Sequence, residues 1–109
     1  MEESVDHWEY DGSFLGFMTI VDRSFREKKF PTLILSPETA VENLFLAEWI
    51  ETDVLRGKKI YRRLRQRLRS ENFQFIQNGF YATLEGKERY LLEAIEIALQ
   101  TKDLLENHL

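Results

Sequence analysis

Apolar residues recur at helical spacing in four segments of the chain. Positions i, i+3, i+4 and i+7 lie on one face of a helix, so such a repeat predicts an amphipathic helix. The clearest repeat covers residues 13–28, and further helices are predicted over 54–69, 70–82 and 85–106. In the first of them the repeated apolar side chains are Phe14, Phe17, Met18, Val21 and Phe25.

Short β-prone runs complete the pattern, all of them in the N-terminal half. Residues 7–10 carry aromatic side chains at alternate positions before a tight turn, and residues 32–35 form an apolar run that ends at Ser36-Pro37. Residues 36–43 predict a loop or a single helical turn, and a strand over 47–51 is the favoured interpretation of a mixed apolar segment. The sequence therefore predicts an α+β fold, mostly helical, with about four helices and a small two- or three-stranded sheet from the N-terminal half.

Small polar residues predict how two of the helices begin. The side chain of Asp11 or Ser13 can accept a hydrogen bond from a free amide of the first helix, and Thr52 or Asp53 can cap the second. Gly16 lies inside the first helix, where glycine costs about 1 kcal/mol relative to alanine, so we expect another part of the chain to approach it closely. The turn before this helix lacks the lysine of a P-loop, and we interpret it as structural rather than as an anion site.

Composition limits the class of protein. A length of 109 residues fits one domain, and a hydrophobic content of 43% is enough for a core. The absence of cysteine excludes disulfides, thiolate metal sites and thiol nucleophiles. The acidic N-terminus does not resemble a signal peptide, and no apolar run approaches the roughly 18 residues that span a bilayer. We therefore predict a cytoplasmic protein that does not enter a membrane.

The net charge of −4 conceals one strongly basic helix. Between Val54 and Ser70 there are eight basic residues and no acidic one. Three interpretations are open: a solvated face whose cations pair with Glu51, Glu71 and the acidic C-terminal helix, a surface that docks on a nucleic-acid backbone, or a surface for an acidic partner protein. The predicted contact residues are Lys58, Lys59, Arg62, Arg63, Arg65, Arg67 and Arg69.

Other candidate chemistry is sparse. Glu48, Glu51 and Asp53 lie close together, as a general acid–base pair or a magnesium or manganese site would require. Asp53 is better explained as a helix cap, and the two glutamates as partners of the basic helix. His7 and His108 lie near opposite ends of the chain without neighbours at ligand spacing, so we interpret both as surface residues. We predict no cofactor and no metal site, and the residues of this chain alone do not favour an enzyme.

Three segments together resemble a bacterial family assigned to DNA metabolism or repair. They are Tyr10-Asp11-Gly12-Ser13-Phe14 with Gly16-Phe17, then Lys29-Phe30-Pro31, then Leu44-Phe45 followed by Ile50-Glu51-Thr52-Asp53 and the basic helix. Members of this family are encoded beside a radical S-adenosylmethionine protein and are sometimes fused to a uracil-DNA glycosylase-like domain. They continue well beyond the length of this chain, so the resemblance implies that residues 1–109 form one domain at the N-terminal end of a longer family protein.

The resemblance implies an accessory domain in DNA metabolism or repair. The family's reaction is not established, so the resemblance identifies no catalytic residue. The implied partners are DNA, the radical S-adenosylmethionine protein and a uracil-DNA glycosylase-like protein. Two alternatives stay open: part of an enzyme whose carboxylate or metal site is completed by a C-terminal half, or a protein–protein interaction module that uses the apolar end at Leu104, Leu105 and Leu109.

Overall fold

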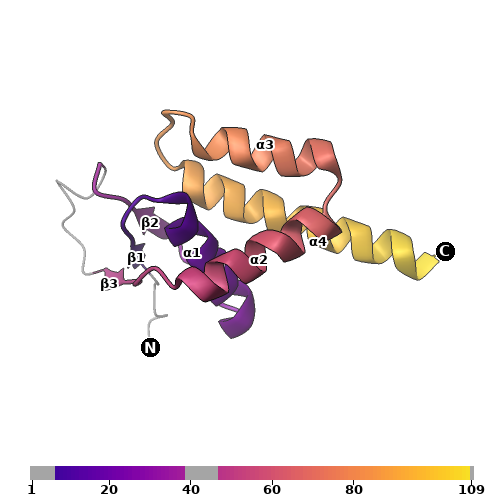
Figure 1. The fold of residues 1–109 in the computed structure, drawn as a ribbon, viewed down its shortest axis with the longest axis horizontal. Coiled ribbons are helices and arrows are strands. Elements are labelled where there is room, and N and C mark those ends of the chain that lie inside the picture. The colour runs from indigo at the N-terminus through magenta and orange to yellow at the C-terminus, as the bar shows by residue number, and fades with distance from the viewer. Residues whose placement is uncertain (1–6, 39–46, 109) are drawn as a thin grey trace. The chain divides into compact units, whose positions relative to one another are not determined.

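A computed structural model describes residues 7–38 and 47–108, and the side chains of these residues up to position 100 (Figure 1). The chain divides into two compact units, residues 1–60 and 61–109, so that the boundary lies within its second helix. Leu44, Phe45 and most of the predicted 36–43 loop lie outside the described residues. The same holds for Leu109 and for the side chains of Leu104, Leu105 and His108.

The first unit contains a small parallel sheet and one complete helix. Its elements are β1 (His7–Glu9), α1 (Phe14–Glu27), β2 (Leu33–Leu35), β3 (Glu48–Trp49) and the beginning of α2 (Val54–Arg67). The strand order is β2-β1-β3, and both pairings with β1 are parallel. Parallel neighbours need a crossover connection, which α1 supplies between β1 and β2.

The central strand carries the largest buried side chains of this unit. Trp8 is opposite Ile34 in β2 and Glu48 in β3, and both Trp8 and Tyr10 are almost completely buried. Backbone bonds from Tyr10 to the Leu35 carbonyl and from Ile50 to the Glu9 carbonyl, at 2.9 and 2.8 Å, extend the two pairings beyond the strands. The sheet therefore places the turn after β1 beside the segment that leads into α2.

The second unit consists of helices. It contains the rest of α2, α3 (Ser70–Phe80) and α4 (Lys87–His108), and Figure 1 shows α3 and α4 side by side and antiparallel. Gly79 of α3 lies against Leu91 of α4, and a Cβ atom at this glycine would be 2.9 Å from the leucine side chain. Among the described side chains of this unit, Glu88 is buried together with the apolar residues Leu64, Leu68, Phe73, Ile76, Phe80, Leu91, Leu92 and Ile95.

The predicted fold class is confirmed: four helices accompany a three-stranded sheet from the N-terminal half. Element ends differ by at most two residues, and β3 has two residues instead of the five predicted. Both residues of β3 are exposed, and short edge strands of this kind resist pairing with other chains. The prediction of a single domain concerns how the two units associate, and it stays a prediction.

Candidate nucleic-acid interface

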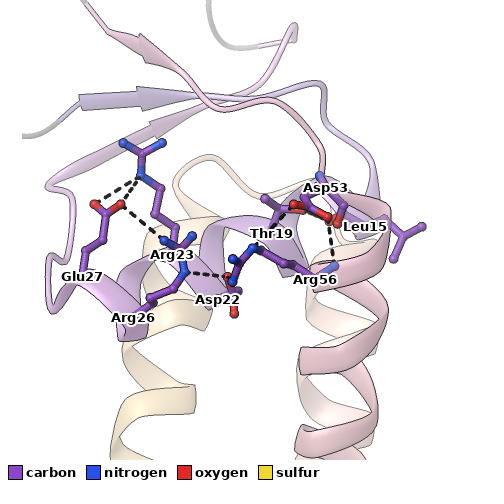
Figure 2. Close-up of polar contacts among 8 residues, drawn as sticks. All are labelled: Leu15, Thr19, Asp22, Arg23, Arg26, Glu27, Asp53 and Arg56. Atoms are coloured by element: carbon purple, nitrogen blue, oxygen red, sulfur yellow. Dashed lines mark hydrogen bonds and ion pairs between the residues drawn. The ribbon is translucent and has the colours of Figure 1, made fainter.

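The start of the basic helix α2 is fixed by side chains of α1 (Figure 2). The Asp53 side chain caps α2 by accepting a hydrogen bond from the Arg56 amide at 3.0 Å, which confirms one of the two predicted caps. The buried Thr19 hydroxyl of α1 accepts a hydrogen bond from the Asp53 amide at 3.0 Å. Gly57 allows close contact between the helices, because a Cβ atom there would lie 3.1 Å from the Leu15 carbonyl oxygen.

The turn after β1 forms a second junction, which we call the Asp11 junction. One oxygen of the Asp11 carboxylate accepts hydrogen bonds from the amide and hydroxyl of Ser13 at 2.9 and 2.7 Å. Its other oxygen accepts a hydrogen bond from the Thr52 hydroxyl at 2.9 Å. Ser13 in turn caps α1 by accepting from the Gly16 amide at 2.9 Å. The junction therefore links the beginning of α1 to the residues that precede α2.

These hydrogen bonds change the acidity of Asp11. Partial burial alone would raise the pKa of its carboxyl, but the bonds from Ser13 and Thr52 outweigh burial and hold the pKa below its ordinary value. A lowered pKa in the folded state means that the ionised group stabilises the fold. This stabilisation is complete above the unfolded pKa and is lost as the pH falls through the folded pKa.

We therefore expect Asp11→Asn to lower the melting temperature at pH 7 and to have less effect as the pH is lowered below about 4, the ordinary pKa of aspartate. Thermal unfolding of both proteins at pH 7, pH 4 and lower values measures this difference. A difference in melting temperature that stays constant over the whole range would show that the charge of Asp11 does not stabilise the fold.

Five cations form the outer face of α2, a name we use for Lys58, Lys59, Arg62, Arg63 and Arg69. All are exposed, whereas the opposite side of the helix buries Gly57, Ile60 and Leu64, and Leu68 is buried just beyond the end of α2. Within the described part of the chain none of the five side chains has an ion pair, hydrogen bond or ring contact. Arg69 lies just beyond the last turn of α2, at the N-cap of α3.

The other cations of the basic helix have partners within the molecule. The Arg56 guanidinium lies 3.6 Å from Asp53 and 3.8 Å from Asp22 (Figure 2). Arg65 lies over the rings of Tyr61 and Phe73, at 5.9 and 5.8 Å from their centroids. Arg67 also takes part in an interaction within the molecule. Of the seven predicted contact residues, Arg65 and Arg67 thus already interact with other residues of the chain.

Two of the expected counter-charges, Glu51 and Glu71, form no ion pair with the outer face among the described residues. Glu51 instead accepts a hydrogen bond from the Trp49 indole at 3.0 Å. The side chains of α4 beyond residue 100 lie outside the described part. Glu51 and Glu71 therefore do not neutralise the cations of α2, contrary to what the interpretation as a solvated face had expected.

The three carboxylates that suggested a metal or acid–base site have separate structural partners. Glu48 binds Arg23 at 2.6 Å, and although partial burial would lower the pKa of that guanidinium, the bonds to Glu48 and Glu27 raise it. Glu51 is bound to Trp49, and Asp53 caps α2. Among the side chains described, no three or more Asp, Glu or His groups are placed to hold a metal ion.

Sequence reasoning missed two residues that position α2. Thr19 lies within a run of apolar residues in α1, and its bond to Asp53 spans 34 positions. Asp22 pairs with both Arg26 and Arg56, and only the first of these lies at the spacing of helical neighbours. The sequence contained no local signal for either long-range contact.

Comparisons of the chain with protein-family models, with curated proteins and with solved structures found no match. The resemblance to a DNA metabolism family therefore stays an expectation from the quoted motifs. No helix in the described part of the chain is long and apolar enough to cross a membrane.

Proposed function

We propose that this chain is a cytoplasmic accessory domain in DNA metabolism or repair that contacts nucleic acid through the outer face of α2. The contact is electrostatic and positions the domain on a phosphate backbone, with no chemistry of its own. Arg65 and Arg67 flank this face and add positive charge to it. The observation that carries the proposal is the set of five exposed cations without partners in the described part of the molecule.

The spacing of these cations suits a polyanion. Lys58 and Lys59 lie four residues, or about 6 Å along the helix axis, before Arg62 and Arg63. Like charges at this distance repel one another, and a bound anion removes the repulsion. Duplex DNA presents one negative charge per about 1.7 Å of its axis, so phosphates can lie opposite each turn of the helix.

The same face offers little for reading a base sequence. The exposed residues of α2 other than cations are Val54, Leu55 and Gln66. Contacts to phosphate fix position and orientation, whereas sequence is read by side chains that reach base edges in the grooves. We therefore expect binding that depends on charge and is largely independent of sequence.

The test is the binding of labelled single- and double-stranded DNA at a series of salt concentrations. For four to five phosphate contacts the logarithm of the binding constant should fall with the logarithm of salt with a slope of about −4 for duplex DNA. Affinity should then drop by roughly two orders of magnitude between about 50 and 200 mM salt. Fluorescence anisotropy with two duplexes of unrelated sequence measures both the slope and the lack of sequence preference.

An absence of binding even at low salt would contradict the proposal. The outer face of α2 would then require an acidic partner protein instead. Under the family resemblance, the radical S-adenosylmethionine protein is the first partner to test, and a uracil-DNA glycosylase-like protein is the second.

A further inference from the structure

Three large side chains of α3 and α4 are exposed to solvent, and we call them the outer aromatic face. Phe75, Tyr90 and Ile97 retain 51%, 61% and 57% of their accessible surface. The rings of Phe75 and Tyr90 contact each other across the two helices, with centroids 6.4 Å apart in an edge-on arrangement. Ile97 lies two turns after Tyr90 on the same side of α4, because seven residues correspond to almost two full turns.

This face has no part in the core of the second unit. The buried side of α4 consists of Glu88, Leu91, Leu92 and Ile95, which lie roughly opposite Tyr90 and Ile97 at 100° per residue. Single exposed apolar residues are common on proteins, but here Phe75 and Tyr90 are in contact and Ile97 lies on the same side of α4, and grouped exposed apolar side chains can mark an interaction site.

The fully exposed charges around the outer aromatic face are negative, although the half-buried cation Arg89 directly precedes Tyr90 in α4. All exposed charged side chains between residues 70 and 100 are glutamates, namely Glu71, Glu85 and Glu93. Glu71 lies one turn before Phe75, and Glu93 lies between Tyr90 and Ile97 along α4. The cation Lys87 is turned to other partners, since its ammonium lies 4.7 Å from the Phe80 ring centroid and 3.2 Å from the Ala82 carbonyl oxygen.

We propose that the outer aromatic face docks an amphipathic helix rich in lysine or arginine from a partner protein. The apolar side of such a helix covers Phe75, Tyr90 and Ile97, as in recognition modes that use anchors at i, i+3, i+4 and i+7. Its cations pair with Glu71 and Glu93, and they can also lie over the exposed aromatic rings. The signs of charge on the two sides are therefore complementary.

A second copy of the chain fits this face less well. Three half-exposed side chains offer roughly 300 Å² of apolar surface, which is small for either occupant, so the signs of charge decide between a second copy and a partner helix. A symmetric contact would also bring the Glu93 carboxylates of two copies into one interface, where like charges repel.

The experiment uses two synthetic helical peptides of about 18 residues, or about five turns. Both have leucine on one side, and the other side is lysine in one peptide and glutamate in the second. Binding to the full chain is measured by fluorescence anisotropy. The lysine peptide should bind at least tenfold more tightly than the glutamate peptide.

Variants then distinguish docking at this face from general attraction to an acidic protein. The double variant Tyr90→Ser with Ile97→Ser should weaken binding of the lysine peptide at least tenfold, and Glu93→Lys should weaken it about fivefold. The matched controls are Leu55→Ser, which removes a side chain that is 82% exposed on α2, and Glu38→Lys, which changes an exposed charge in the first unit. Both controls should bind the peptide normally.

Three results would overturn the proposal. The first is equal binding of the two peptides, and the second is equal weakening by the control variants. The third is a dimer of the unmodified chain in light scattering that the Tyr90→Ser and Ile97→Ser variant abolishes, which would assign the face to a second copy. None of these measurements involves DNA, so they are independent of the function proposed for α2.

Discussion

Replacing Arg62 and Arg63 together by glutamate should weaken DNA binding at least about thirtyfold at moderate salt. Each arginine that contacts a phosphate contributes a charge-assisted interaction, and losing two of them costs at least about 2 kcal/mol of binding free energy. Each lost phosphate contact also reduces the salt slope by about one, so the slope should fall by about two. Anisotropy titrations of both proteins over one salt series measure the two effects together.

These two arginines are chosen because their loss should leave the fold intact. Both are exposed and have no ion pair, hydrogen bond or ring contact in the described part of the chain. Arg65 is exposed as well, but it lies over Tyr61 and Phe73, so its replacement would mix a loss of binding with a loss of packing. Removing repulsion among neighbouring cations should leave the melting temperature of the Arg62 and Arg63 variant unchanged or slightly raised.

The matched control is the pair Lys28→Glu and Lys29→Glu. These two lysines are exposed at the end of α1, and replacing them by glutamate changes the net charge by the same amount as the Arg62 and Arg63 variant does. The control should lose much less affinity, because the lysines do not lie on α2. If both variants lose the same affinity, binding follows net charge and not the outer face of α2. If the Arg62 and Arg63 variant unfolds, the two arginines are structural.

The sequence predicted most of the secondary structure because the signals for it are local. A helical repeat, a cap and a proline are each contained within a few residues, so α1, α2 and α3 begin within a residue of their predicted positions. The parallel order of the sheet could not be predicted in this way. It depends on contacts between residues 7–9 and residues far along the chain, such as Leu33 and Glu48.

The geometry of the candidate interface could be predicted in part, while its role stays a prediction. The exposed cations of α2 follow from their charge and from the apolar stripe on the opposite side. The position of Arg65 over two rings could not be predicted from the sequence, because it depends on the packing of α2 against Phe73 of α3. The exposure of Tyr90 and Ile97 was missed for a similar reason. Helix α4 has apolar residues on several sides, and only the packing of the unit decides which of them are buried.

Two of the segments that carry the family resemblance meet in the structure. Asp11 from the first of them is hydrogen-bonded to Thr52 from the last, although 41 positions separate them. The same junction surrounds Gly16, another residue of the first segment. This contact gives the residues a role in holding the first unit together. Their recurrence in a family would then follow from folding and does not by itself require a catalytic site.

Gly16→Ala should therefore destabilise the protein, although alanine favours helices more than glycine. A Cβ atom at this position would lie 2.5 Å from an Asp11 carboxylate oxygen, 2.9 Å from the Tyr10 ring and 3.0 Å from the Thr52 hydroxyl. Tyr10 is fully buried and cannot move away easily. Overpacking of this kind costs about 1–3 kcal/mol, and displacing Asp11 also weakens its hydrogen bonds. The higher helix propensity of alanine stabilises the folded state by at most about 1 kcal/mol, which is less than this cost.

We expect a net loss of about 2 kcal/mol, which corresponds to a fall in melting temperature of roughly 10 °C for a domain of this size. A double-mutant cycle with Asp11→Ala identifies the cause. If the methyl group acts by displacing the Asp11 carboxylate, the double variant should be more stable than the sum of the two single effects predicts. Additive effects would place the strain at Tyr10 instead. A higher melting temperature for Gly16→Ala would contradict this. It would show that the side chains of the Asp11 junction can move to admit a methyl group with little loss of stability, and that the junction does not fix the start of α1 against Thr52.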